Sequence, residues 1–255
     1  MFAMAMERMP EGPPSAGPVP AGEAAARRAL RVQMLATEHW SLLATRSLSW
    51  NESFARAGMF LTLLSGATVA LALVAQATAF GTGFAVFGLL ILPVVLFVGL
   101  ATYVRLLEIN NEDYVWVRGM NRLRAAYLEI DPQLAQYFIT GTTEDAVGIF
   151  RTFGADAATE RTLDTGRFHG LVTTPTTIAF VDATLAAVLA AIVAVQLSPP
   201  QSMLMPAGIG VITFFAAGVA LALFGYRSQQ MAHLAPTARA SGADASSNSQ
   251  QEGSQ

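Results

Sequence analysis

The residue whose type and position most suggest chemistry is Asp182, an acid inside a long apolar stretch. A carboxylate at the middle of a bilayer costs about 2.5–3.5 kcal/mol on insertion scales, and less near the membrane edge. Arg56 and Arg105 lie at the ends of two other apolar stretches and are the available counter-charges. The sequence therefore predicts an intramembrane ion pair between Asp182 and one of these arginines, which would fix helix packing. Two alternatives stay open: an ion- or proton-binding role, and a solvated side chain at the membrane edge.

No other group of residues predicts a catalytic, cofactor or metal site. His39, His169 and His233 are far apart and match no metal-binding spacing, and the chain has no cysteine. No nucleophile lies near a general base in the apolar stretches, so we expect no enzymatic activity and no cofactor. The net charge of -3 gives no electrostatic basis for binding nucleic acid.

Composition and patterning predict an all-α membrane protein. The chain is 53% hydrophobic and 13% charged, whereas soluble domains carry about 25% charged residues. Residues 58–80, 84–107, 177–197 and 203–226 each have roughly the 20 apolar residues that span a bilayer. The remaining chain is too small to bury four such helices in a soluble protein. We therefore expect four transmembrane helices, arranged as two hairpins.

The arginines predict the orientation. The links 81–83 and 198–202 carry no charge, whereas arginines cluster before the first span, between 104 and 176, and after the fourth span. By the positive-inside rule, both termini and the central segment are cytoplasmic. All 15 basic residues are Arg, which with the high Ala content suggests a GC-rich bacterial genome. We expect a multi-pass protein of the bacterial cytoplasmic (inner) membrane.

These features divide the chain into six parts. Residues 1–22 and most of 227–255 are poor in residues that can form a core and are predicted to be disordered tails. Residues 23–57 form a cytoplasmic helix and 58–107 the first transmembrane hairpin. Residues 108–176 form a cytoplasmic helical segment, and 177–226 the second hairpin.

Two apolar seams predict that spans 1 and 2 continue out of the membrane as an antiparallel helical stalk. Each seam repeats at spacings of 3 and 4, as in packed helices. One consists of Trp40, Leu43, Ser47, Trp50, Phe54, Ala57 and Leu61, and the other of Leu106, Ile109, Asp113, Trp116, Met120, Leu123, Tyr127 and Ile130. The predicted register sets Phe54 level with Ile109–Asp113 and Trp40 level with Met120–Leu123. In the alternative, residues 39–57 lie flat on the inner leaflet with the tryptophans in the headgroups.

The segment after the stalk contains weaker signals. Asp131-Pro132 ends the stalk helix, and "PQLAQYFIT" is a short helix candidate. "TTEDAVGIFRTFG" predicts another helix, with Thr142 or Thr143 as its N-cap and Gly154 as its stop. Residues 155–177 are expected to form a loop with a brief helix before Pro175.

Two features of the spans bear on packing. Asp182, Ala186, Ala190 and Ala194 form a row of small residues that lets helices approach closely, so Asp182 is expected to face protein rather than lipid. Pro93 is expected to bend the second span.

The stretches "EHWSLLATRSLSWNESFARAGMF" and "GMNRLRAAYLEIDPQLAQYFIT" resemble an uncharacterised family of integral membrane proteins from GC-rich bacteria. The similarity covers roughly residues 30–230 and implies no functional residue, because that family has no assigned activity. The layout also resembles that of the SLATT proteins, two-span effectors in bacterial nucleotide-signalling defence. This chain carries a second hairpin that they lack.

Two functions follow as hypotheses. The first is a non-enzymatic scaffold, regulator or accessory subunit of the membrane, with the stalk docking a cytoplasmic protein or a second copy of the chain. The second is an oligomeric ion channel or small transporter that uses Asp182 and the bent second span. The expected partners are the lipid bilayer and one of these proteins.

Overall fold

The computed structural model of the protein describes residues 20–153, 173–197 and 203–252, with side chains as far as Gln230. The described chain is helical, with no strand. Its elements are α1 (Ala21–Thr78), α2 (Thr82–Ile130), the 3-10 helix η1 (Pro132–Tyr137), α3 (Ala146–Thr152), α5 (Thr174–Leu197) and α6 (Leu204–Glu252). The predicted N-terminal tail lies almost wholly outside the described residues, as does most of the predicted loop before Pro175.

The structure confirms four helices that can cross a membrane. The most apolar windows of α1, α2, α5 and α6 have mean hydropathies of 2.0, 2.8, 2.5 and 2.2. At about 1.5 Å per residue, the 24 residues of α5 cover the hydrocarbon core with little to spare. The other three helices are longer than a bilayer needs.

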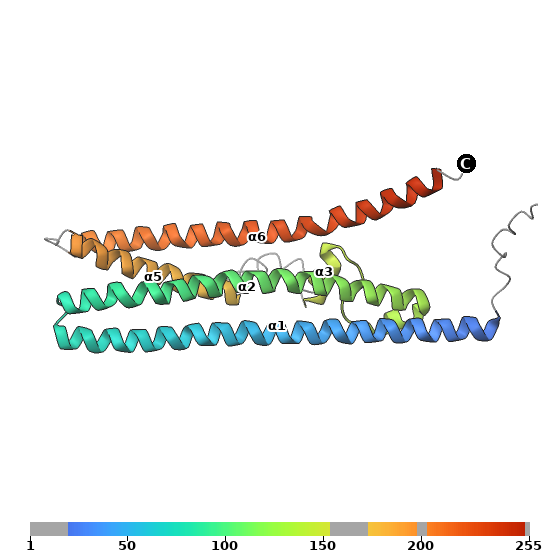
Figure 1. Ribbon diagram of the computed structural model, residues 1–255, viewed down its shortest axis with the longest axis horizontal. Helices are drawn as coiled ribbons and strands as arrows, with labels where there is room; N and C mark the ends of the chain where they lie inside the picture. The colour runs from blue at the N-terminus through green and yellow to red at the C-terminus, as the bar shows by residue number, and fades with distance from the viewer. Residues whose placement is uncertain (1–19, 154–172, 198–202, 253–255) are drawn as a thin grey trace, which may run out of the picture.

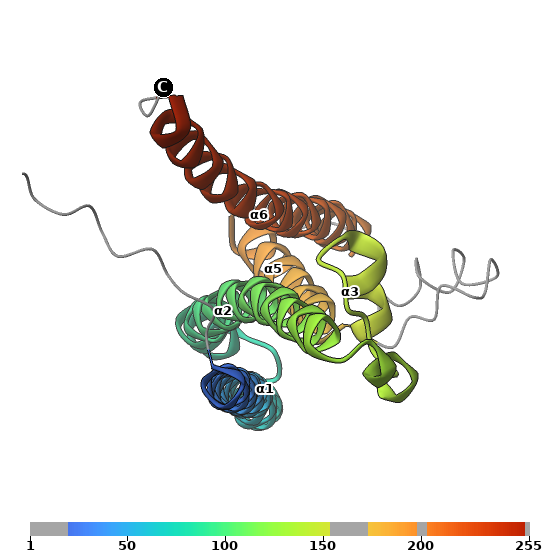
Figure 2. The same ribbon diagram turned by 90° about the vertical axis from the view of Figure 1, so that its right-hand side faces the viewer.

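The four long helices lie in a row in the order α1, α2, α5, α6 (Figures 1 and 2). Helix α2 packs against α1 on one side and α5 on the other, and α5 packs against α6. The apolar core lies where α1, α2 and α5 meet, and includes Phe60, Val95, Leu106 and Ile178. Consequently α1 and α6 occupy the two edges of the row, each with one broad face free of contacts within the described chain.

A tight turn reverses the chain between α1 and α2. Ala79 and Phe80 both have positive φ angles, of 47° and 58°. The Ala79 N–H donates to the Ala75 carbonyl, which satisfies one of the last carbonyls of α1. The turn thus begins two residues before the predicted 81–83 link.

Small residues bring α5 and α6 together. A Cβ added at Gly210 would lie 3.4 Å from the Ala187 carbonyl oxygen and 3.7 Å from the Ala191 Cβ. Each of these alanines lies one residue beyond a member of the predicted row, Ala186 and Ala190. Close approach of α6 therefore uses small residues beside that row.

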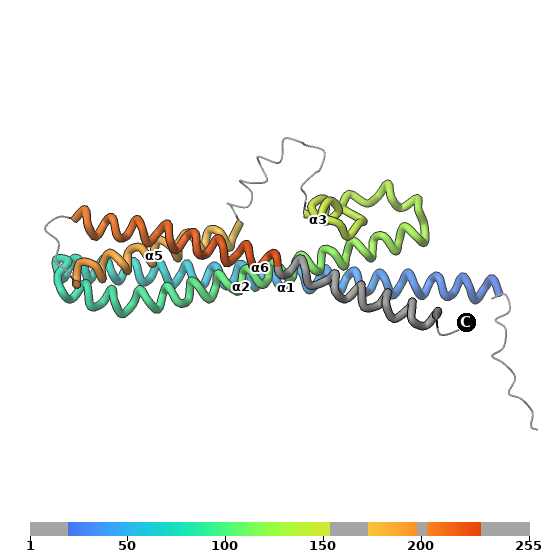
Figure 3. Tube along the Cα trace, turned by 90° about the horizontal axis from the view of Figure 1, so that it is seen from above, coloured from blue at the N-terminus to red at the C-terminus, as the bar shows by residue number. Residues whose placement is uncertain are grey.

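Two short helices fold back onto the far half of α2, away from the α1–α2 turn (Figure 3). The predicted helix after Asp131 is η1, which is a single 3-10 segment. The second predicted helix is α3, but its N-cap is Asp145, whose side chain accepts from the Gly148 N–H. Asp145 replaces the predicted Thr142 or Thr143 because it lies directly before the first helical turn. Helix α6 runs to Glu252, beyond residue 227, where the sequence predicts a mostly disordered tail.

Candidate functional site

Asp182 lies inside the bundle, at the junction of three helices. Its side chain comes from α5, and the residue is only 1% exposed. A Cβ added at Gly99 of α2 would lie 1.9 Å from Asp182 Oδ1 and 2.8 Å from Phe60 Cε2 of α1. Gly99 therefore provides the space that the carboxyl group occupies. The inward direction predicted from the alanine row is correct.

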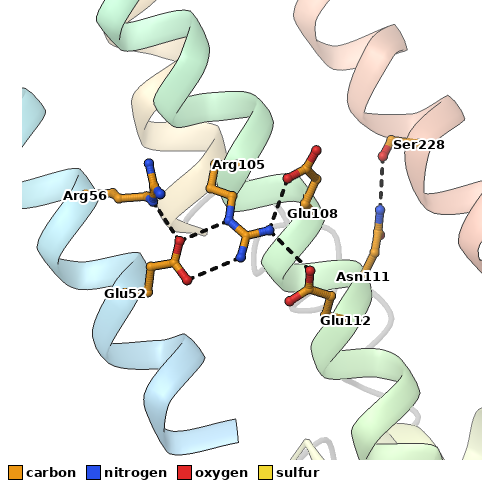
Figure 4. Close-up of polar contacts among 7 residues, drawn as sticks. All are labelled: Glu52, Arg56, Arg105, Glu108, Asn111, Glu112 and Ser228. Atoms are coloured by element: carbon orange, nitrogen blue, oxygen red, sulfur yellow. Dashed lines mark hydrogen bonds and ion pairs between the residues drawn. The ribbon is translucent and has the colours of Figure 1, made fainter. Parts of the chain in front are cut away.

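The predicted ion pair of Asp182 is not formed. Arg105 donates to Glu52 from Nε at 3.0 Å and from Nη2 at 3.2 Å, and Arg56 Nε donates to the same carboxylate at 2.8 Å (Figure 4). Neither carboxyl oxygen of Asp182 has a hydrogen-bond partner. Glu52 binds both arginines because it lies one helical turn from Arg56 and faces Arg105 across the α1–α2 contact.

The charged cluster around Arg105 joins α1 to α2. Besides Glu52, Arg105 Nη1 donates to Glu108 at 3.1 Å and to Glu112 at 3.2 Å (Figure 4). The hydrogen bonds from Arg105 and then Arg56 lower the pKa of Glu52 to about 2. Glu52 therefore stays ionised through the physiological pH range. Because Glu52, Glu108 and Glu112 all accept hydrogen bonds from arginine, the cluster offers no free base, and its structural role is to hold α1 against α2.

A second polar contact ties α2 to α6 at the same level. Asn111 Nδ2 donates to Ser228 Oγ at 3.0 Å (Figure 4). Deeper in the bundle, the Tyr103 hydroxyl donates to the Leu221 carbonyl at 2.8 Å. These two contacts connect α6 to α2 near the Arg105 cluster. Neither contact was predicted from sequence.

On α2, the predicted seam faces α1. Ile109 and Met120 are 4% and 3% exposed, Trp116 and Leu123 are partly buried, and the Tyr127 ring stacks on His39 at 6.0 Å. The single acid of the seam, Asp113, is 5% exposed. It binds Arg46 of α1 through two hydrogen bonds, of 2.6 and 3.2 Å.

On α1, the predicted seam is wrong except near its end, where Ala57 is buried. Trp40, Trp50 and Phe54 are 72%, 48% and 60% exposed. The face toward α2 instead carries His39, Leu42, Arg46 and Ser49, which repeat at spacings of 3 and 4 and are partly or fully buried. The physical reason is charge: the buried Asp113 needs a cation, and the face with Arg46 supplies one whereas the tryptophan seam has none.

The register also differs from the prediction near the membrane. Arg46 pairs with Asp113, Glu52 with Arg105, and Arg31 with Glu129. Leu42 lies against Gly119, since a Cβ added there would meet Leu42 Cδ1 at 3.3 Å. Trp40 is therefore level with Met120, as predicted. Phe54 is level with the helical turn around Arg105, one turn nearer the membrane than the predicted Ile109–Asp113.

Arg46 is surrounded by partners from three parts of the chain. Besides Asp113, its guanidinium lies 6.0 Å from the Trp50 ring and 5.6 Å from the ring of Phe153, which follows α3. Both distances are within the range of cation–π attraction. Arg46 thus links α1 to α2 and to the end of α3.

A buried polar core beneath α3 was also not predicted from the sequence. Asn121 is 0% exposed; it donates to the Thr143 carbonyl at 2.8 Å and accepts from Thr152 at 2.7 Å and Arg124 at 2.8 Å. Arg124 is 8% exposed, and burial followed by the charge of Arg46 lowers its pKa. Outside this core, Glu144 binds Arg118 and Arg122. The one sequence signal for this core was the pair of glycines Gly141 and Gly148. A Cβ added at Gly141 would lie 1.9 Å from the Gly148 carbonyl oxygen, so the two backbones approach closely there.

The described residues contain no group of three His, Asp or Glu side chains that could hold a metal ion. No family model, curated protein or solved structure matches the chain.

The outer face of α1 is a broad exposed surface of the described chain. It lies beside the face that packs on α2, and its large side chains Trp40, Leu43, Trp50 and Phe54 are 40–72% exposed. Gly58, Thr62 and Ser65 continue this face into the apolar part of α1 and are also exposed. The hydroxyl groups of Thr62 and Ser65 donate to backbone carbonyls of their own helix, so this part of the face needs no polar partner.

Proposed function

We propose that the protein is a non-enzymatic membrane scaffold, regulator or accessory subunit that docks a partner on the outer face of α1. The observation that supports this most directly is the exposed apolar seam of that face. Its residues Trp40, Leu43, Ser47, Trp50 and Phe54 repeat at spacings of 3 and 4, the pattern by which one helix packs on another. Exposed, contiguous aromatic surface of this kind is typical of an interaction site.

The proposed location is the inner membrane of a bacterium, with both termini and residues 104–176 in the cytoplasm. The charge-free links and the clustered arginines support this orientation. In it, α2 extends about 35 Å beyond Leu107, and α1 runs beside it as the antiparallel stalk. The ion pairs Arg46–Asp113 and Arg31–Glu129 hold the two helices together along that length.

Reporter fusions test the orientation. A fusion at Pro132 or at the C-terminus should give a cytoplasmic signal, and a fusion at Gly83 an external one, because translocation of arginine-rich segments is disfavoured. Matched alkaline phosphatase and fluorescent protein fusions at each position provide the measurement. An external signal at Pro132 would contradict the proposed topology.

The proposed occupant of the outer face is the α1 helix of a second copy of the chain. Copies inserted in one membrane share their orientation, so two α1 helices would run parallel about a two-fold axis along the membrane normal. The seam then matches itself along its length. Within the membrane, Gly58, Thr62 and Ser65 on the same face allow two helix backbones to approach closely.

Cysteine crosslinking tests the self-association. We expect Ser47→Cys to form an intermolecular disulfide in native membranes, because residue 47 lies on the seam and parallel packing brings its copies within the ~7 Å Cα separation that a disulfide needs. The chain has no natural cysteine, so the product is unambiguous. It would be measured as a dimer on non-reducing gels.

Ser41→Cys is the matched control. Ser41 is equally exposed on α1 but lies on a flank, outside the seam, so its crosslinking should be at least several-fold weaker. Equal crosslinking at both positions would indicate random collision. A monomer at both positions would overturn the second copy as occupant, and a different partner could then be sought on the same face.

A further inference from the structure

The Asp182 carboxyl group has no partner, although it is buried. In the described part of the chain, its two oxygens are the buried side-chain polar atoms without a hydrogen bond. Buried polar groups are almost always satisfied, and an exception calls for an explanation. An ionised carboxylate here would lose its hydration without gaining a hydrogen bond or a counter-charge, which strongly disfavours the charged form.

The surrounding helices supply no charge that could offset an ionised Asp182. From α1 the neighbour is Phe60, and from α2 it is Gly99. The apolar part of α1 from Gly58 to Thr78 has no acidic or basic residue, and neither do the remainder of α5 and the Leu204–Tyr226 part of α6. Tyr103, one turn from Gly99 on α2, already donates its hydroxyl proton to the Leu221 carbonyl.

The two arginines predicted as counter-charges bind other acids. Arg56 and Arg105 bind Glu52, and Arg105 also binds Glu108 and Glu112. Arg105 lies six residues beyond Gly99 along α2, about 9 Å at 1.5 Å per residue. The site therefore accommodates the carboxyl group in its neutral form.

We propose that Asp182 is a proton-binding site within the bundle, in which the bound proton neutralises the carboxyl group. Binding converts the carboxylate and one proton into a carboxylic acid, and release returns the proton to water on the side of the Glu52–Arg105 cluster. Release places a negative charge directly against the Gly99 backbone, where α1, α2 and α5 meet. Proton occupancy thus controls how closely α5 packs on α2. This inference does not depend on the proposed docking function.

Infrared spectroscopy tests the proposal on the full chain in phosphatidylcholine vesicles. The C=O stretch of a carboxylic acid is separate from the bands of a carboxylate. At neutral pH we expect a carboxylic acid band in the wild-type protein that is absent from Asp182→Asn. The other acids are present in both proteins, so their bands cancel in the difference between the two spectra.

Two results would overturn the proposal. If the wild-type and Asp182→Asn spectra differ only in carboxylate bands at neutral pH, Asp182 is ionised and the proposal is overturned. A carboxylate band that appears only with added sodium or potassium would replace the proton with a metal cation as the ligand, and also overturns it. If Asp182→Asn does not fold, Asp182→Glu keeps the acid and should shift the carboxylic acid band, whereas an unshifted band would assign it to another residue.

Discussion

Arg46→Met is expected to destabilise the α1–α2 pair by about 3 kcal/mol or more, because it leaves Asp113 buried without a counter-charge. Asp113 is 5% exposed and receives two hydrogen bonds from Arg46. The methionine keeps much of the apolar length of the arginine, so the loss reports mainly on charge. The measurement is the free energy of unfolding in detergent, followed by the helical circular dichroism signal during denaturant titration.

Two further variants identify the cause. Arg46→Met combined with Asp113→Leu removes both charges and should recover much of the lost stability, since an apolar pair can replace a buried ion pair. Arg31→Met removes one partner of the Arg31–Glu129 pair, whose side chains are 56% and 66% exposed, and should cost less than about 1 kcal/mol. Equal losses for Arg46→Met and Arg31→Met would contradict the structural role of the buried pair.

The face of α2 that packs on α1 was predicted correctly from the sequence, whereas the face of α1 that packs on α2 was not. On α2, only one face carries an unbroken apolar repeat, so Ile109, Met120 and Tyr127 could be placed from spacing alone. On α1, two faces repeat at spacings of 3 and 4. The aromatic face is more apolar, but the face with Arg46 packs on α2, where Arg46 pairs with Asp113. The spacing of apolar residues alone does not show which of the two faces carries the cation that the buried acid needs.

For Asp182, the sequence predicted correctly that the side chain faces into the bundle, but wrongly that it pairs with Arg56 or Arg105. The alanines of α5 indicate which way the side chain points, because small residues mark a helix contact. The choice of counter-charge depends on the competing acids. Glu52 lies on the helix opposite Arg105 and one turn from Arg56, and it binds both. The core around Asn121 was not predicted, because it forms only when Thr143 and Thr152, distant in sequence, fold back onto α2.

Gly99 offers the most direct test of the junction around Asp182. We expect Gly99→Ala to destabilise the bundle by about 1–3 kcal/mol, the usual cost of overpacking a core. The added Cβ would lie 1.9 Å from Asp182 Oδ1 and 2.8 Å from Phe60 Cε2, so α2 and α5 must separate. Thermal unfolding in detergent or nanodiscs would show a lower midpoint.

The matched control is Gly218→Ala on α6, where an added Cβ meets nothing within 4 Å. Alanine favours helix over glycine by up to about 1 kcal/mol, so this variant should be neutral or slightly more stable. Gly99→Ala combined with Asp182→Ala removes the colliding carboxyl group and should regain part of the loss. If Gly99→Ala unfolds at the same temperature as Gly218→Ala, then Asp182 does not pack against the α2 backbone, and the closed environment on which its proton binding depends is absent.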